Sequence, residues 1–301
     1  MARDLAVIPD AVAALVDPAR ARVASWDPAQ RRVEWAVDLP GALSARVSDE
    51  RERFDAVADW RREVLETEAP GPWTDSPWLE PGEVSLLLRR HPEVAEVRGL
   101  EVLDLGGTCP VSWRFLADGA AAVHQVDVSP VSQAVGLERC RLHGVDEARL
   151  VFHTVPAERL PFRDASFDLV FSRNSVHHVS RPAAYDELAR VLKPGGHLLV
   201  FEPWLNRVMR PVVMGRRRVL RIDRGTDDPL GSRDRAWLED RFTSVDVGLV
   251  GAGVTPIVWA LARFRPLHPM LRALRRGEGR LAGVPAVGRA LATHGWVLAR
   301  R

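Results

Sequence analysis

The chain has 301 residues, which suits one large domain or two modest ones, and 46% of them are hydrophobic, so it can bury a substantial core. Its two cysteines, Cys109 and Cys140, are too few for a disulfide framework or a metal site, and we predict a cytoplasmic protein without a bound metal. The acidic residues Asp4 and Asp10 interrupt the N-terminal apolar residues, so we expect no signal peptide.

The net charge is only +2, but it is unevenly distributed. Residues 205–301 hold 19 arginines against 8 acidic residues, whereas residues 1–204 hold 23 basic and 32 acidic residues. This asymmetry suggests that the C-terminal part faces something anionic. Arginines alternate with aliphatic residues over 205–221, which favours either an acidic substrate or peripheral contact with a membrane interface. The alternative is a solvated helix that packs its aliphatic face on the sheet.

Residues 1–95 read as an N-terminal extension or lid ahead of the main domain. Two β-like runs at 21–26 and 31–37 flank a turn and predict a hairpin. Helical spacing of apolar residues predicts an amphipathic helix over 49–68. The proline-rich stretch that follows carries Trp73 and Trp78, which serve as an aromatic lid over the substrate or pack the extension onto the core. A helix at 83–90 leads into the main domain.

Residues 96–301 alternate strand and helix patterns. Helices are expected from about Pro110, after Ser129, after Ser180 and at 235–241. A basic segment at 205–234 precedes the last of these helices. The β-α order predicts a doubly wound, mostly parallel sheet. A helical insertion at 250–290 precedes the last strand. Strands are expected at 101–105, up to Asp127, and at 150–154, 167–172, 197–202, 242–249 and 295–299.

The most informative stretch runs from Val102 to Asp127. One apolar run leads to Asp104 and the glycine pair Gly106 and Gly107, and a second ends at Asp127. This pattern of strand, glycine turn, helix, strand and acid is typical of nucleoside binding at the strand ends of a doubly wound sheet. The glycines let the backbone approach the ligand, and the second acid accepts hydrogen bonds from the ribose hydroxyls. Simple capping of the next helix is the alternative for Asp127.

Three further segments, AERLPF (157–162), SFDLVFS (166–172) and RVLKPGG (190–196), follow this stretch. Together they resemble the class I S-adenosylmethionine-dependent methyltransferases, particularly the ubiquinone/menaquinone-type group, over roughly residues 100–204. The resemblance implies a Rossmann-like α/β fold with a seven-stranded sheet that ends in an antiparallel strand. It also implies the cofactor S-adenosyl-L-methionine and methyl transfer to oxygen, nitrogen or carbon of a small-molecule or lipid-like acceptor.

By the same resemblance, the backbone from Asp104 to Thr108 passes beneath the methionine end of the cofactor. Asp127, with Val128 after it, holds the ribose. Two later glycine positions of the family turn are occupied here by Thr108 and Pro110.

A further departure concerns the adenine. Pro156 stands where the family often has an acid that contacts the adenine amine, so adenine contact falls to the backbone near Ala157 or to Glu158. These departures leave a second reading open, a non-catalytic methyltransferase-fold protein that serves in binding or assembly.

Candidate catalytic residues follow the strand at 167–172. By resemblance, this edge faces the methyl group, so Arg173 and Asn174 are expected to contact the cofactor. Arg173 is also expected to pair with a substrate anion, and Asn174 to position a substrate hydroxyl or amine. A neutral imidazole at His177 is a candidate general base. The alternative is a structural pair, His177 and His178. Asp168 is expected to orient a loop rather than react.

Two other classes are disfavoured. A dinucleotide dehydrogenase would carry a different fingerprint in the first turn. A nucleic-acid methyltransferase would be expected to show a base-flipping motif near Asn174 or an RNA-binding module, and neither is visible, so no nucleic-acid partner is expected.

Overall fold

A computed structural model describes residues 4–66, 91–106, 111–142, 144–205, 227–250 and 294–301, with a few isolated residues between 210 and 273. The proline-rich stretch with Trp73 and Trp78, the helix expected at 83–90, and most of the basic segment and helical insertion lie outside the described residues. No helix in the described part is long and apolar enough to span a membrane.

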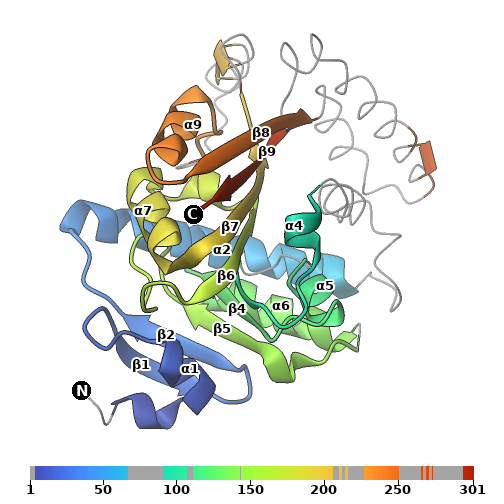
Figure 1. The fold of residues 1–301 in the computed structure, drawn as a ribbon. Coiled ribbons are helices and arrows are strands. Elements are labelled where there is room, and N and C mark those ends of the chain that lie inside the picture. Colours follow the sequence, from blue (N-terminus) through green and yellow to red (C-terminus); the bar gives the residue numbers. More distant parts are fainter. Residues whose placement is uncertain are drawn as a thin grey trace.

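The described elements follow the expected β-α order (Figure 1). The helices are η1 (Asp4–Val7), α1 (Asp10–Leu15), α2 (Gly41–Glu66), α4 (Pro92–Ala95), α5 (Val111–Ala117), α6 (Pro130–Leu142), η3 (Glu147–Arg149), η4 (Val176–His178), α7 (Arg181–Val191) and α9 (Ser232–Glu239). The strands are β1 (Arg22–Asp27), β2 (Arg32–Ala36), β3 (Glu101–Leu105), β4 (Ala122–Asp127), β5 (Leu150–Thr154), β6 (Phe167–Arg173), β7 (Leu192–Pro203), β8 (Ser244–Val250) and β9 (His294–Arg300).

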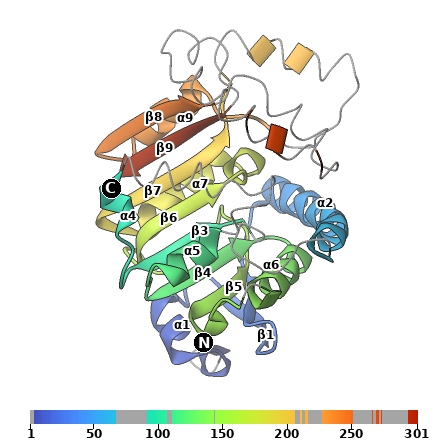
Figure 2. The same ribbon diagram turned by 90° about the vertical axis from the view of Figure 1, so that its right-hand side faces the viewer.

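The described strands form one sheet in the order β1-β2-β5-β4-β3-β6-β7-β9-β8 (Figure 2). Each neighbouring pair within β2-β5-β4-β3-β6-β7 is parallel, whereas β1 is antiparallel to β2 and β9 is antiparallel to both β7 and β8. The prediction of a doubly wound, mostly parallel α/β sheet with an antiparallel last strand is therefore confirmed for β3 to β9.

The sheet is extended beyond that expectation by the N-terminal hairpin. Strands β1 and β2 pair with each other as predicted, and β2 then pairs with β5 from Arg32↔Phe152 to Glu34↔Thr154. The division of the chain at residue 95 stays a prediction, but the hairpin ahead of it belongs to the same sheet as the strands after it.

A chain of buried hydrogen bonds reinforces this attachment. The Trp35 indole donates to His153 Nδ1 at 3.1 Å, and because an indole N–H can only donate, His153 must carry its own proton on Nε2. His153 Nε2 then donates to His124 Nδ1 at 3.0 Å, and His124 Nε2 lies 3.5 Å from Glu101. A row of contacting side chains thus links β2, β5, β4 and β3 across the sheet.

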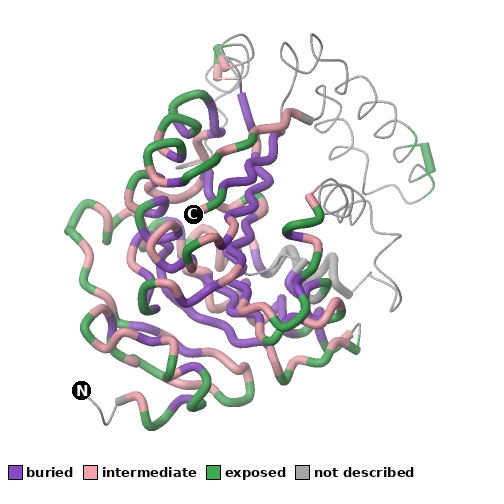
Figure 3. The backbone as a smooth tube through the Cα atoms, in the orientation of Figure 1, coloured by how far each residue is buried: buried purple, intermediate pink, exposed green. Residues whose placement is uncertain are grey.

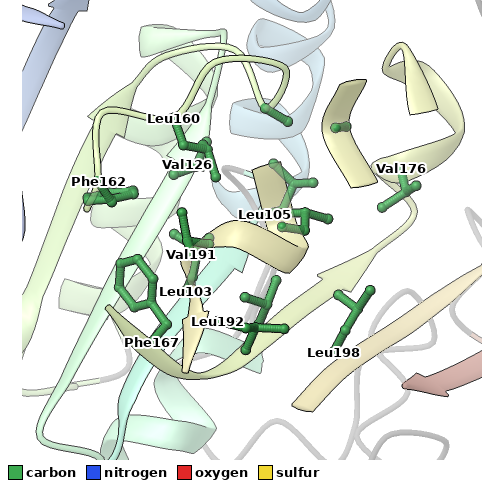
Figure 4. Close-up of a cluster of buried hydrophobic side chains, with 14 of the residues drawn as sticks. Leu103, Leu105, Val126, Leu160, Phe162, Phe167, Val176, Val191, Leu192 and Leu198 are labelled. Atoms are coloured by element: carbon green, nitrogen blue, oxygen red, sulfur yellow. The ribbon is translucent and has the colours of Figure 1, made fainter. Parts of the chain in front are cut away.

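Helices cover both faces of the sheet, because successive residues of the central strands point to opposite faces and are apolar on each face. Leu103 faces a core shared with α1, α7 and α9, whereas its neighbour Val102 faces a second core shared with α4, α5 and α6. Figure 3 shows the strands buried between exposed outer helix faces, and Figure 4 shows part of the first core. Full burial of each such side chain contributes about 1.5–3 kcal/mol.

Two expected boundaries were wrong by five residues or more, and helix α9 begins at Ser232 rather than at residue 235. Helix α2 begins at Gly41 rather than Asp49, because the carbonyl of Pro40 accepts hydrogen bonds from Leu43 and Ser44 and starts the first turn earlier. Strand β7 begins at Leu192 rather than His197: Phe167 pairs with Leu192 before the register shifts, so the Pro-Gly-Gly turn bulges within the strand.

Candidate active site

The candidate site lies along the carboxyl ends of the parallel strands. Strand β3 lies between β4, the next strand in the chain, and β6, which follows only after β5 has been placed on the far side of β4. Such a reversal of strand order is a topological switch point, and ligands of doubly wound sheets bind in the crevice outside it.

Gly106 forms the turn at this switch point. Its φ of +123° lies outside the range of other residues, and an added Cβ would lie 2.2 Å from Ser175 Oγ. Its amide donates to Val126 O at 2.9 Å, which ties the turn to the end of β4. The backbone at Gly106 therefore carries no side chain and is closely approached by Ser175. Gly107 and Thr108 lie outside the described residues.

Asp104 lies beneath this turn and is fully buried. Its Oδ2 accepts from the Ser112 hydroxyl, while its Oδ1 has no hydrogen-bond partner among the described residues. Burial raises the pKa of the Asp104 carboxyl to about 7. Gln125 donates from Nε2 to Gly106 O at 3.1 Å, so the polar groups below the turn hold its backbone.

Asp127 ends β4, and both readings of this residue fit its contacts. Its Oδ1 accepts from Ser129 N at 2.7 Å, so the carboxylate helps to start α6, as the capping alternative expected. The side chain is only partly buried, and a carboxylate has further lone pairs to offer. Above it, Asp55 of α2 accepts from Ser129 Oγ at 2.5 Å, so α2 lies next to this position.

A pocket of about 220 Å³ opens beyond Asp127, toward β5 and β2. Val128 and Pro156 line it, but Glu158 does not. Glu158 is buried and accepts from Ser180 N at 2.6 Å, and burial raises its pKa. Ala157 is also buried. The carboxylate of Glu158 is thus committed to the start of α7.

Asn174 and Arg173 end β6 on the other side of the switch point. Asn174 is exposed and has a φ of +54°, a conformation that asparagine tolerates better than most residues. The guanidinium of Arg173 lies 5.9 Å from the centre of the Phe201 ring, within cation–π range.

His177 is buried between two carboxylates that sequence reasoning missed. Its Nδ1–H donates to Glu202 Oε2 at 2.5 Å, and its Nε2 lies 3.9 Å from Asp227 Oδ1. Glu202 is fully buried, and its Oε1 accepts from the amides of Ser175 and Val176 at 2.8 Å each. Nothing local marks Glu202 in the sequence except that an acid ends an otherwise apolar strand.

His178 turns toward α2 instead. Its carbonyl accepts from Arg46 at 2.5 Å, its ring meets Phe54 edge-on at 5.0 Å, and Glu50 lies 3.8 Å from its Nδ1. The adjacent histidines therefore face different neighbours. Helix α2 covers the edge of the site from Ser129 to His178.

Asp168 lies at the opposite, amino end of the strands. It accepts from Glu101 N at 2.9 Å and from Lys193 Nζ at 2.8 Å. The expectation that it orients the chain rather than reacts agrees with these contacts.

A family model described as a methyltransferase domain matches residues 103–200, the span from β3 to β7 that builds the switch point. Over this span the chain is therefore similar to a methyltransferase domain. It is 31% identical over 172 residues to the ubiquinone/menaquinone biosynthesis C-methyltransferase UbiE of Bartonella tribocorum, which covers 52% of this chain and 60% of that protein. It is 41% identical over 110 residues to the demethylmenaquinone methyltransferase of Clavibacter sepedonicus, with 36% and 43% covered. The chain therefore spans at most 60% of the length of these relatives.

Solved structures show the same fold for the methyltransferase domain and its neighbouring strands. The magnesium protoporphyrin IX methyltransferase of Synechocystis PCC 6803 superimposes with a TM-score of 0.54 at 14% identity, covering 85% of this chain and 99% of that one. A sarcosine dimethylglycine methyltransferase from Galdieria sulphuraria, assigned provisionally, gives a TM-score of 0.52 at 18% identity, covering 72% and 85%.

Proposed function

We propose that the protein transfers a methyl group from S-adenosyl-L-methionine to a small-molecule or lipid-like acceptor. One observation carries the proposal: the bare turn at Gly106 and the acid Asp127 end adjacent parallel strands beside the switch point. In doubly wound folds, a glycine turn of this kind approaches the ligand and the second acid binds ribose hydroxyls.

The described residues fit such a cofactor. Gly106 leaves no side chain on the turn, where a Cβ would lie 2.2 Å from Ser175 Oγ, and Asp104 Oδ1 below it is a buried acceptor with no hydrogen-bond partner among the described residues. The sulfonium of S-adenosylmethionine activates its own methyl group, so the protein needs chiefly to hold the reactants in line. In this arrangement the turn at Gly106 lies next to the cofactor, and the Asp127 carboxylate accepts hydrogen bonds from the ribose hydroxyls. The backbone near Ala157 contacts the adenine.

Acceptor chemistry falls to the β6–β7 side of the switch point. The exposed amide of Asn174 positions the acceptor, Arg173 pairs with an anionic group on it, and His177 takes up a proton where the acceptor must lose one. The relatives include a C-methyltransferase and the phosphoethanolamine N-methyltransferase 2 of Caenorhabditis elegans, so their names support a small-molecule acceptor without fixing the attacked atom.

The alternative is a non-catalytic methyltransferase-fold protein that serves in binding or assembly, which the absence of an acid at Pro156 favours. Calorimetry with S-adenosylhomocysteine, followed by incubation with methyl-labelled cofactor and small-molecule and lipid extracts, separates the two. Binding with label transferred to an extracted compound supports the enzyme. Binding without transfer to any extract favours the alternative, and the absence of binding overturns the proposed enzyme and also favours the alternative.

An acidic substrate and a peripheral membrane contact remain part of this proposal. They rest on the charge of residues 205–301, whose described arginines are Arg210, Arg233, Arg235, Arg241, Arg300 and Arg301. Arg210 pairs with Asp228 and donates to Pro229 O at 2.9 Å, so this arginine fastens the segment to the rim of the site.

A further inference from the structure

The pocket beyond Asp127 has walls from two separate parts of the chain. The methyltransferase domain supplies one wall, and the strand β2, the turn after it and helix α2 supply the other. The first wall consists of Val128, Thr154, Val155 and Pro156, and the second of Glu34, Trp35, Ala36, Val37, Leu39, Val47 and Arg51. Most of these side chains are apolar, and the charged ones among them are Glu34 and Arg51.

Glu34 retains capacity to accept a further hydrogen bond. Its Oε1 accepts from Arg51 at 2.8 Å, whereas its Oε2 has a long contact of 3.5 Å with Ser25 Oγ. Its side chain is 35% exposed, and each carboxylate oxygen carries two lone pairs. Glu158, the acid nearest in sequence to Pro156, is already bound to Ser180 N and does not line the pocket.

We propose that this pocket takes the adenine of the cofactor and that Glu34 accepts a hydrogen bond from its exocyclic amine. The inference rests on the proposed function, because Asp127 fixes the ribose and the base must lie beyond it. A flat base fits between apolar walls, and one charged group at the rim supplies the orientation. The N-terminal hairpin, far from Pro156 in sequence, thus supplies the acid that position 156 lacks.

An acceptor molecule is the rival occupant, and strand order argues against it. The pocket lies at the ends of β2 and β5, whereas Asn174 and His177 follow β6. Three strand spacings separate β5 from β6, which is about 14 Å. An acceptor in the pocket would therefore hold its reacting atom on the wrong side of the ribose.

The test compares two cofactor products, S-adenosylhomocysteine and S-inosylhomocysteine, which carries a 6-carbonyl in place of the 6-amine. Calorimetry on the wild-type chain is expected to show about 10- to 100-fold weaker binding of the inosyl compound, the range of one hydrogen bond to a charged group. Glu34→Ala should bind the adenosyl compound more weakly and lose most of that preference. Glu34→Gln, whose amide can donate to the 6-carbonyl, should shift the preference toward the inosyl compound.

Glu52→Gln is the matched control, because it removes the same charge from the exposed surface of α2 outside the pocket. It should keep the wild-type preference. If the wild type binds S-adenosylhomocysteine but Glu34→Ala keeps the full preference, Glu34 is not the acceptor and this inference fails while the proposed function stands. If the wild type binds neither compound, the proposed function fails first.

Discussion

At the scale of single residues, Asp127 offers the most direct test of cofactor binding. Asp127→Ala should weaken S-adenosylhomocysteine binding by on the order of 2–3 kcal/mol, as expected for hydrogen bonds to a charged group. Asp127→Asn is the informative companion, because its amide oxygen can still accept from Ser129 N and start α6. Calorimetry with thermal melting measures both effects. Unchanged affinity in both variants would leave Asp127 with the capping role alone.

Asp104 makes stability depend on pH, because burial raises its pKa to about 7. In the folded protein this carboxyl keeps its proton up to about pH 7, whereas in the unfolded chain it loses the proton near pH 4. Its contribution to the free energy of unfolding is therefore full below about pH 4 and is lost as the pH rises to about 7. Asp104→Asn, which stays neutral, should lack this loss and be more stable than the wild type at pH 8, by on the order of 2–4 kcal/mol. Urea unfolding at pH 5 and pH 8 measures the difference. A parallel decline of both proteins between these pH values would contradict the assignment.

Glu202 is expected to act through His177. Glu202→Gln removes the anionic acceptor of the Nδ1–H bond, so turnover should fall by about 10-fold or more, while cofactor affinity stays unchanged, as when the group that orients a functional histidine is lost. Ser172→Ala, which removes a 3.4 Å contact with Glu202 but leaves the imidazole bond, is the control. Equal turnover in wild type and Glu202→Gln would make His177 a structural residue.

At the scale of elements, the hairpin β1–β2 is fastened by a histidine that must stay neutral. Burial, and then neighbouring His124, hold the pKa of His153 well below its usual range. His153 takes up a proton near pH 6.5 in the unfolded chain but stays neutral in the folded chain at that pH. Its contribution to the free energy of unfolding is therefore present above about pH 6.5 and is lost as the pH falls.

Amide hydrogen exchange should therefore show β1 and β2 opening more readily at pH 5 than at pH 7.5, after correction for intrinsic rates, with the strands β6 and β7 less affected. His197→Gln is the control, because His197 lies on β7, far from the hairpin. Uniform opening of the whole sheet at pH 5 would show that the hairpin is not a separate weak point.

The elements also show what the sequence could predict. Strands β3 and β5 lie where expected, because each is a short apolar run bounded by residues that end strands. Pairing of β2 with β5 joins residues 120 positions apart, as between Val33 and His153, and depends on matching strand edges that no local pattern reveals. The partners of His177 were missed for the same reason: Glu202 reaches it from a strand 25 positions away.

At the scale of the whole molecule, the charge asymmetry leads to a prediction about binding to anionic membranes. If residues 205–301 contact a membrane surface, the protein should sediment with vesicles rich in anionic lipid at low salt and be released at high salt, since each basic residue near such a surface contributes about 1 kcal/mol. Neutral vesicles are the control. Retention in the supernatant with both kinds would leave the arginines to an acidic substrate or to packing.

The pairing of the hairpin with β5 also sets an order of events during synthesis. Strand β2 leaves the ribosome long before its partner β5 exists, and a contact over such a separation forms slowly because a long loop must close first. The pocket between β2, α2 and β5 therefore forms late in folding, after the strands from β3 onward have begun to assemble. A chain that loses its first 40 residues would still contain every strand from β3 onward, but β5 would present a bare edge, open to pairing with another chain.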